Sequence, residues 1–329
     1  MNSTDLSTFT ADETVAEIMA DYALRYPSSH RTYLGGSAIG DPCARRLWLK
    51  FRWVQLEQFE GRMLRLFQTG HLAEPRFIND LRWIGVEVLD VDPSTGQQFA
   101  VSFLGGHLRG HADGAALGIK GAEKTWHLLE FKTHSAKSFA TLQAKGVQEA
   151  KPQHWAQMQL YMHGLELTRA YYLAVNKNTD ELYGERIHYD QAAAEELVDR
   201  GRRIIFASEP PAPISDRPDW YECKMCSLHQ FCHKADHRQE LPEVNCRTCI
   251  HSTPTEDGGW VCEQSQKSLS TEEQREGCHL HLWMPSLFPS LEYTHADQDE
   301  VDGTVTAVHY TGPAGAVVND HAGRMQPWF

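Results

Sequence analysis

The sequence lacks the features of a membrane-spanning or secreted chain. It has no run of roughly 18 or more apolar residues, the length from which a membrane-crossing helix is inferred. Its N-terminus, MNSTDLSTFTADETVAEIMA, has neither the basic start nor the apolar stretch of a secretion signal. We therefore expect a cytoplasmic protein with no membrane partner. In that reducing compartment disulfides are rare, so the eight cysteines indicate metal binding or chemistry.

The sequence also lacks an excess of positive charge. It has 31 Lys and Arg against 44 Asp and Glu, a formal net charge of −13. This balance argues against non-specific nucleic-acid binding over the whole surface, because phosphate attraction needs clustered basic side chains. Basic residues do predominate in residues 41–65 and 132–151, whereas residues 286–329 are acidic.

Two further absences limit the function. No G-x-x-x-x-G-K-[ST] phosphate-binding loop occurs, which excludes an ATP-driven motor of the common kind. No internal repeat is present either.

Helix-like and strand-like segments occur together and indicate an α/β fold with helices on a central mixed sheet. We expect helices in residues 44–67 (interrupted near Gly61), 69–85, 152–167 and 190–207. We expect strands in residues 86–91, 97–103, 107–117, 126–133, 169–176 and 182–189.

A Pro-rich linker, EPPAPISDRPDW, follows the last of these segments and indicates a boundary. We divide the chain into an N-terminal extension at 1–34, the α/β core at 35–240, a cysteine-rich module at 241–285 and an acidic tail at 286–329. Within the tail, residues 303–318 have the pattern of a β-hairpin.

The stretch HLLEFKTH contains a charged pair two positions apart, Glu130 and Lys132. In a strand these side chains point to one face, whereas Leu129 and Phe131 point to the other. Upstream, Asp113 lies on or beside another strand. Two carboxylates with an adjacent amine form an oxygen site for Mg²⁺ or Mn²⁺ and an activated water, which is the chemistry of phosphodiester hydrolysis. The alternative is an ordinary pair of strands with solvated charges.

Two helical pairs could complete this site. His71 and Glu74 lie three residues apart, on one helical face, where the imidazole could be a third metal ligand. Gln157 and Tyr161 lie four apart and offer an amide and a phenol that suit phosphate or base edges. The alternatives are a structural histidine and a core aromatic residue.

Four motifs follow one another along the chain: G-H-x-x-E, G-x-x-D, E-x-K and Q-x-x-x-Y, at Gly70, His71, Glu74, Gly110, Asp113, Glu130, Lys132, Gln157 and Tyr161. In order and combination they resemble the RecB-like branch of the PD-(D/E)XK nuclease superfamily over residues 35–232. The proline that nominally precedes the aspartate is replaced by Ala112, a position at which this branch is lax.

The resemblance implies a role for each motif residue. The catalytic metal ligands would be His71, Asp113 and Glu130, and Lys132 would assist the attacking water. The residues that bind DNA near the cleaved phosphate would be Gln157, Tyr161 and Glu74.

The first cysteine group, Cys223, Cys226 and Cys232, has C-x2-C-x5-C spacing and supplies three ligands, so a fourth must come from a distance. Cys43 is the remaining cysteine outside the second group. The chain is similar in this respect to the iron–sulfur type of RecB-like nuclease, including AddB and CRISPR-associated exonucleases, in which one cysteine precedes the core and three follow it. That resemblance implies a [4Fe–4S] cluster, whereas ligand spacing alone favours zinc.

The second group, Cys246, Cys249, Cys262 and Cys278, has C-x2-C-x12-C-x15-C spacing and fits a four-coordinate zinc ion. A nearby imidazole could replace one thiolate, with His281 the favoured substitute among His251, His279 and His281. A structural role and a role in binding a partner or DNA both remain open for this module.

These observations together predict a metal-dependent DNA exonuclease that acts on ends or single strands in phage or bacterial recombination, repair or replication. A helicase or recombination partner would supply the DNA, because the chain has no motor of its own. The alternatives are a structure-specific endonuclease on the same fold and a catalytically idle scaffold that binds DNA or a helicase. The presence of Asp113, Glu130 and Lys132 together favours an active enzyme.

Overall fold

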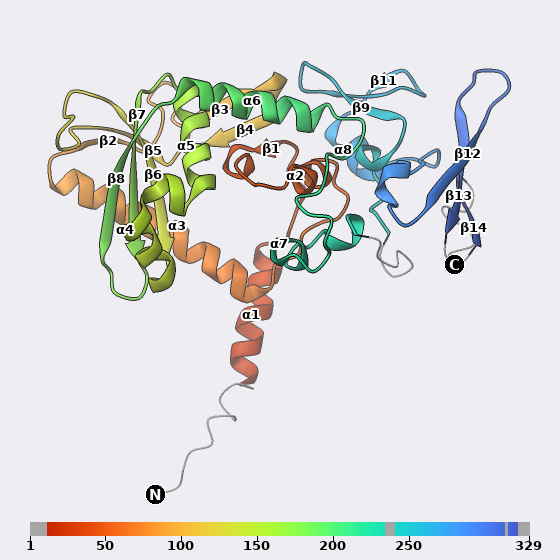
Figure 1. Ribbon diagram of the computed structural model, residues 1–329. Helices are drawn as coiled ribbons and strands as arrows, with labels where there is room; N and C mark the ends of the chain where they lie inside the picture. The colour runs from red at the N-terminus through yellow and green to blue at the C-terminus, as the bar shows by residue number, and fades with distance from the viewer. Residues whose placement is uncertain (1–11, 234–240, 313–314, 322–329) are drawn as a thin grey trace, which may run out of the picture. The chain divides into compact units, whose positions relative to one another are not determined.

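The computed structural model describes residues 12–233, 241–312 and 315–321, and Figure 1 shows how these residues run through the fold. Two compact units are present. The first comprises the chain up to His30 together with Glu57–Phe99 and His111–Tyr189. The second comprises Arg31–Leu56, Ala100–Gly110 and the chain from Asp190 onward. Among the described residues, none of the helices combines the length and the apolarity that a bilayer crossing requires.

The first unit contains a five-stranded sheet in the order β2-β5-β6-β7-β8. Only β6 and β7 are parallel, because two helices carry the chain back between them. The strands are β2 (Glu87–Leu89), β5 (Gly114–Leu117), β6 (His127–His134), β7 (Arg169–Asn176) and β8 (Leu182–His188).

Helices α4 (Ala136–Ala150) and α5 (Pro152–Gly164) form the crossover from β6 to β7. Helix α3 (Gly61–Trp83) contributes Phe77 and Leu81 to a buried cluster that includes Leu129 and Phe131 of β6. Since side chains alternate along a strand, Glu130 and Lys132 project from the opposite face of β6, as their spacing predicts.

The helical segments differ from the sequence expectation near α3. A single helix spans Gly61–Trp83, where two helices were expected, and Pro75 lies inside it. The first residue of this helix is Gly61. Only glycine fits there, because a Cβ would collide with the carbonyl oxygen of Met19 on helix α1 (Glu13–Arg25). Helices α1 and α4 were not predicted from the sequence.

The second unit contains a small sheet in the order β1-β4-β3. Its strands are β1 (Leu34–Gly35), β3 (Ala100–Phe103) and β4 (Leu108–His111), and its helices are α2 (Ala44–Phe51), α6 (Gln191–Ile205) and α7 (Tyr221–Lys224). The expected interruption of the 44–67 helix is wider than predicted, because α2 ends at Phe51.

The cysteine-rich segment of this unit contains β9 (Ser252–Pro254), β10 (Trp260–Cys262), β11 (Lys267–Ser268) and α8 (Thr271–Glu276). Its buried Arg247 donates hydrogen bonds to the carbonyl oxygens of Phe51 at 3.0 Å and Thr32 at 2.9 Å. The same guanidinium lies 3.8 Å from the ring centroid of Trp53. These contacts join the segment to residues 31–56 within one unit.

The chain then forms an antiparallel sheet of β12 (Glu292–Gln298), β13 (Val305–Gly312) and β14 (Gly315–Asp320). Strands β13 and β14 correspond to the hairpin expected in residues 303–318, and β12 adds a third strand. Tyr310 and Asn319 are buried, and Asn319 donates to the carbonyl oxygen of Trp283 at 3.0 Å.

Candidate active site

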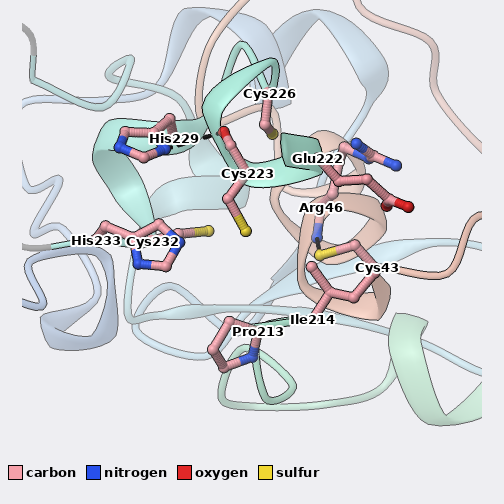
Figure 2. A pocket seen from close by; sticks show the side chains of 10 residues that line it. All are labelled: Cys43, Arg46, Pro213, Ile214, Glu222, Cys223, Cys226, His229, Cys232 and His233. Carbon is pink, nitrogen blue, oxygen red and sulfur yellow. Dashed lines mark hydrogen bonds between the residues drawn. The ribbon is translucent and has the colours of Figure 1, made fainter. Parts of the chain in front are cut away.

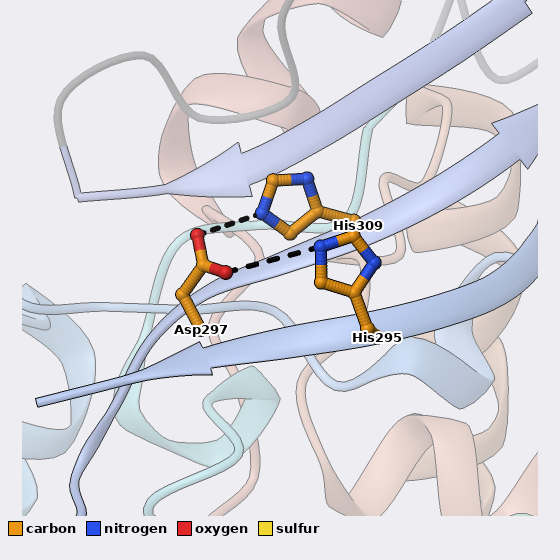
Figure 3. Close-up of side chains that lie close together, drawn as sticks. All are labelled: His295, Asp297 and His309. Atoms are coloured by element: carbon orange, nitrogen blue, oxygen red, sulfur yellow. Dashed lines mark hydrogen bonds and ion pairs between the residues drawn. The ribbon is translucent and has the colours of Figure 1, made fainter.

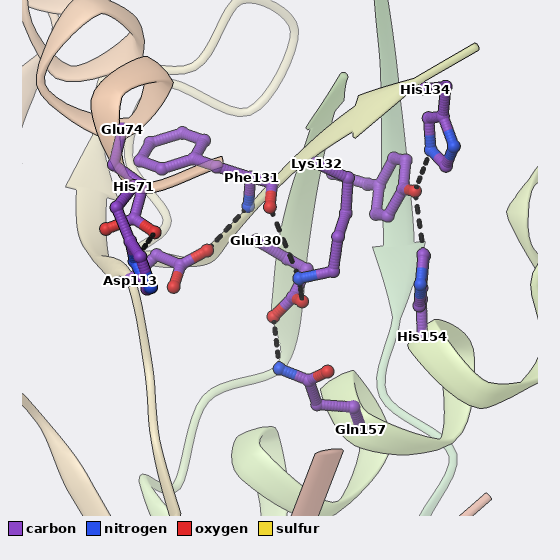
Figure 4. Close-up of polar contacts among 10 residues, drawn as sticks. His71, Glu74, Asp113, Glu130, Phe131, Lys132, His134, His154 and Gln157 are labelled. Carbon is purple, nitrogen blue, oxygen red and sulfur yellow. Dashed lines mark hydrogen bonds and ion pairs between the residues drawn. The ribbon is translucent and has the colours of Figure 1, made fainter. Parts of the chain in front are cut away.

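The centre of the site is the charged pair on β6. The Glu130 side chain is 0% exposed, and the Lys132 ammonium pairs with its Oε1 atom, as Figure 4 shows. Lys132 Nζ also donates to the carbonyl oxygen of Phe131 at 3.2 Å. Removing a carboxylate and an ammonium group from water costs desolvation free energy unless both are paired and hydrogen-bonded. Ionisable pairs of this kind are common at functional sites, so the pair marks a candidate site.

Asp113 is tied to the same strand. It precedes β5, and its Oδ2 atom accepts a hydrogen bond of 2.7 Å from the backbone N–H of Phe131. The next residue, Gly114, has φ +148° and would place a Cβ 2.7 Å from the carbonyl oxygen of Leu89. Glycine therefore lets β5 pair with β2 while Asp113 faces the residues of β6.

Helix α3 contributes the third element of the site. His71 Nδ1 lies 3.3 Å from Glu74 Oε1, and the His71 side chain is 76% exposed. Figure 4 shows both side chains beside Asp113. The sequence motif G-H-x-x-E is therefore brought to the carboxylates, with the imidazole on the solvent side.

Helix α5 places Gln157 directly on the central carboxylate. Its Nε2 atom donates a hydrogen bond of 2.8 Å to Glu130 Oε2, so Lys132 and Gln157 engage the two oxygens of Glu130 separately. Tyr161, one turn further along, is buried at 2% exposure. The site therefore includes Gln157 as a neighbour of a carboxylate, a contact that its spacing in the sequence does not indicate.

The carboxyl groups of the site carry perturbed pKa values. Burial is the largest cause that raises the pKa of Glu74, Asp113 and Glu130, and the negative charge of Asp113 raises the first and third further. Burial alone would lower the pKa of Lys132, but the charges of Glu130 and Asp113 outweigh it and raise this pKa. Mutual repulsion among carboxylates is what a bound cation would relieve.

The side chains fit a divalent cation in their chemistry. Carboxylate oxygens are the donors that Mg²⁺ and Mn²⁺ prefer, and an imidazole is acceptable to Mn²⁺. In the structure, the donor atoms of His71, Asp113 and Glu130 do not all lie within 4.8 Å of one another. To share one ion, these side chains would therefore have to move together.

A groove adjoins the site within the first unit. It runs along α3 to the end of β6 and is lined by Leu66, Phe67, Gly70, His71, Glu74, Phe77, Phe131, Lys132, Thr133 and Lys177. It combines two cationic side chains with exposed apolar ones, among them Phe67, which is 42% exposed. Such a surface suits a phosphate backbone with stacked bases.

Sequence reasoning missed a polar network on the same face of β6. Tyr172 Oη is hydrogen-bonded to His134 Nε2 at 2.8 Å and to His154 Nδ1 at 2.9 Å. Ser138 Oγ lies 3.1 Å from His134 Nδ1 and accepts from Lys151 Nζ at 2.6 Å. The available signal was the position of His134, two residues beyond Lys132 in one strand.

The two imidazoles of this network are held neutral. Burial, followed by the positive charge of nearby lysines, lowers the pKa of His134 to about 4 and that of His154 to about 3. Burial is also the largest cause that raises the pKa of Tyr172, and the charge of Glu130 adds to it. The two histidines therefore add hydrogen bonds beside Lys132 without adding positive charge of their own.

The first cysteine quartet is assembled within the second unit. Cys43, Cys223, Cys226 and Cys232 line one pocket, shown in Figure 2. Cys43 is the N-cap of α2, and its Sγ accepts from the backbone N–H of Arg46 at 3.4 Å. Burial is the largest cause that raises the pKa of Cys232 to about 12, and the other three sulfurs add to it.

The second quartet is likewise assembled in that unit. Cys246, Cys249, Cys262 and Cys278 line one pocket with His251, His279 and His281. Burial and the three neighbouring sulfurs raise the pKa of Cys246 to about 12. The Nε2 atom of His281 lies 3.1 Å from Thr248 Oγ1, so this nitrogen already has a protein partner.

The distances between the sulfur atoms can be compared with those that a zinc ion or a four-iron cluster requires. In neither quartet do three sulfur atoms lie within 4.8 Å of one another. A tetrahedral zinc ion, with bonds of about 2.3 Å, draws its thiolates to about 3.8 Å apart. A four-iron cluster lies between its thiolates and therefore holds them further apart.

Comparisons with known proteins place this arrangement in context. A family model described as the PD-(D/E)XK nuclease superfamily matches residues 11–233. No curated protein matches the chain.

Solved structures similar to the chain are distant in sequence. One is the crystal structure of SSO0001, with 14% identity, a TM-score of 0.40 and coverage of 68% of this chain and 97% of that chain. A second is an alkaline exonuclease, LHK-Exo from Laribacter hongkongensis, with 14% identity, a TM-score of 0.36 and coverage of 56% and 90%. LHK-Exo in complex with dAMP matches at 15% identity and a TM-score of 0.36, with coverage of 57% and 90%.

Proposed function

This chain belongs to the PD-(D/E)XK nuclease superfamily, and from its site we propose that it is a metal-dependent deoxyribonuclease that acts as an exonuclease. One observation carries the proposal: the partly buried side chains of Asp113 and Lys132 converge on the strand of the fully buried Glu130, where Asp113 accepts from the backbone of Phe131 and Lys132 pairs with Glu130. A chain that had lost catalysis would have no need to keep this costly arrangement of charges.

The residues of the site have distinct roles in this proposal. His71, Asp113 and Glu130 would hold Mg²⁺ or Mn²⁺, which supplies positive charge that activates water and neutralises phosphate. Lys132 keeps its proton, so it donates hydrogen bonds and stabilises negative charge that develops on the phosphate. Gln157 holds the Glu130 carboxylate in one orientation.

The substrate would reach the site through the groove along α3. Lys132 and Lys177 supply positive charge there, and Phe67 offers an exposed ring on which a base could stack. Glu74, Gln157 and Tyr161 are the DNA-binding residues that the motif resemblance implies. Action from DNA ends, in phage or bacterial recombination, repair or replication, rests on the resemblance to the RecB-like branch. A helicase partner would supply those ends.

The two cysteine quartets are proposed to bind different groups. Cys43, Cys223, Cys226 and Cys232 would hold a [4Fe–4S] cluster, because the four line one pocket and have the arrangement of the iron–sulfur type of RecB-like nuclease, with one cysteine before the core and three after it. Cys246, Cys249, Cys262 and Cys278 would bind Zn²⁺ after closing around it. Both groups would stabilise the second unit without taking part in cleavage.

Digestion of labelled DNA tests the nuclease proposal. End-labelled linear DNA, single- and double-stranded, and closed circular DNA would be incubated with Mg²⁺ or Mn²⁺ and protein purified without oxygen. We expect wild-type protein to release nucleotides from linear DNA and to spare the circle, whereas Glu130→Gln and Lys132→Met abolish release. The exposed Glu181→Gln is the matched control and should retain full activity.

The outcomes separate the alternatives. Cleavage of the circle would indicate an endonuclease. Wild-type rates in Glu130→Gln or Lys132→Met, or binding of DNA with no cleavage by folded wild-type protein in either metal, would overturn the proposal.

A further inference from the structure

A group of metal-donor side chains lies far from the motif residues in sequence, on the sheet of β12, β13 and β14. It consists of His295, Asp297 and His309, shown in Figure 3. Within the described part of the chain, these are the only three such residues whose donor atoms all lie within 4.8 Å of one another.

The two imidazoles face the same carboxylate. His309 Nε2 lies 2.8 Å from Asp297 Oδ2, and His295 Nε2 lies 3.9 Å from Asp297 Oδ1. The two rings are stacked, with centroids 4.1 Å apart and planes within 6°. A surface ion pair needs one histidine for one carboxylate, so the second ring is the feature that requires a further explanation.

The strand register brings these residues together. Tyr293 pairs with Tyr310 and His295 pairs with His309, so β12 has one extra residue, Thr294, in between. In a regular ladder His295 would pair with Val308, which is buried, and would lie on the opposite face from His309. The bulge therefore turns His295 toward His309, which is how bulges at functional sites re-aim a side chain.

The site faces solvent and has an ion-binding composition. The side chains of His295 and Asp297 are 62% and 55% exposed, and that of His309 is 25% exposed. Two imidazoles and one carboxylate suit Zn²⁺ and its neighbours in the transition series, whereas Mg²⁺ prefers oxygen donors alone. Three protein ligands leave at least one coordination position for water or another ligand.

We propose that His295, Asp297 and His309 form a solvent-open binding site for a Zn²⁺-type transition-metal ion. The ion bridges β12 and β13, and it is separate from both the oxygen-rich nuclease site and the cysteine quartets. Binding therefore stabilises the C-terminal sheet, because it links two strands that are otherwise joined by backbone hydrogen bonds.

Metal stoichiometry of the full-length protein tests the site. Untagged protein, purified without nickel or chelator, would be dialysed against Zn²⁺ and analysed for bound zinc and iron. His295→Ala, His309→Ala and Asp297→Asn should each bind about one zinc fewer per chain than wild type, with unchanged iron. Glu292→Gln on the same strand and His188→Ala, at an exposed position of β8, are matched controls and should bind as wild type does.

A second measurement uses the wild-type protein alone, so that it does not depend on how the variants fold. In protein with ¹⁵N-labelled histidine, Zn²⁺ should shift the ring-nitrogen signals of His295 and His309 saturably, and Mg²⁺ should not. Equal zinc content in wild type and all three variants, or unshifted signals for both histidines at saturating zinc, would overturn the proposal.

Discussion

Gln157 donates a hydrogen bond of 2.8 Å to Glu130, the carboxylate whose other oxygen pairs with Lys132. The contact crosses from α5 to β6 and leaves the buried Glu130 held from two sides. We propose that Gln157 positions the Glu130 carboxylate, in addition to the contact with DNA that the motif resemblance implies. Its effect on the reaction can be separated from DNA binding by kinetics.

Gln157→Leu should lower kcat by about 10- to 100-fold with a smaller change in KM. The reason is that one hydrogen bond to a charged group contributes about 1.5–3 kcal/mol, and each 1.4 kcal/mol is about tenfold in rate. Gln159→Leu, two residues along α5, is the control, since Gln159 donates to the His188 carbonyl oxygen and should affect stability alone. An unchanged kcat in Gln157→Leu would rule out the positioning role.

His71→Ala should raise the Mn²⁺ concentration needed for half-maximal activity by at least about tenfold, and high Mn²⁺ should restore the rate. An imidazole ligand contributes more to Mn²⁺ than to Mg²⁺ affinity, so the Mg²⁺-dependent rate should depend less on this residue. His188→Ala, which removes an exposed imidazole outside the site, is the control and should leave the Mn²⁺ requirement unchanged. Full activity of His71→Ala at low Mn²⁺ would show that His71 is not a ligand.

Protein purified without oxygen should be brown and contain about four irons per chain, because a cubane cluster has four. Cys43→Ser should lose most of this iron and lower the melting temperature, while any correctly folded fraction should keep its specific nuclease activity. The cluster would join α2 to the chain around α7, and neither lies in the unit that contains Glu130. Colourless protein that is fully active and contains zinc but no iron would contradict the assignment.

Cys262→Ser should lower the zinc content by about one equivalent per chain and leave iron unchanged, since the second quartet is expected to hold a single ion. The test needs the full chain, because Arg247 next to Cys246 packs against Phe51 and Trp53. Loss of metal should therefore also loosen that packing and lower the melting temperature. Equal zinc content in Cys262→Ser and wild type would contradict the prediction.

The melting temperature should fall as the pH drops from about 7.5 to about 5. The pKa values of His134 and His154 in the folded chain, about 4 and about 3, lie below the ordinary value of 6.5. The unfolded chain therefore binds more protons below pH 6.5, so stability present at neutral pH is lost as the pH falls. The loss at about pH 5 is at most about 2 kcal/mol per histidine.

His154→Gln should reduce this pH dependence, because glutamine can still bond to the Tyr172 hydroxyl but does not titrate. The exposed His188→Gln should leave the dependence unchanged. If the melting temperatures of wild type and His154→Gln fall by the same amount across this pH range, then His154 is not held neutral.

Several features could be read from the sequence because they depend on neighbours along the chain. The two-residue spacing of Glu130 and Lys132 placed both on one face of β6, and residues 169–176 form β7 with the predicted bounds. The motif order also indicated the superfamily that the family model matches over residues 11–233. The cysteine spacing separated a trio from a quartet, and Cys43, which the family resemblance joined to the trio, lines the same pocket as Cys223, Cys226 and Cys232.

Other features were decided by tertiary structure, because they depend on contacts between distant segments. The crossover through α4 and α5 brings Gln157 to Glu130, and the register of β6 and β7 sets Tyr172 opposite Glu130, near His134 and His154. The extra residue in β12 pairs His295 with His309. Periodicity defines the face of one helix or strand, but only packing and register determine which faces meet.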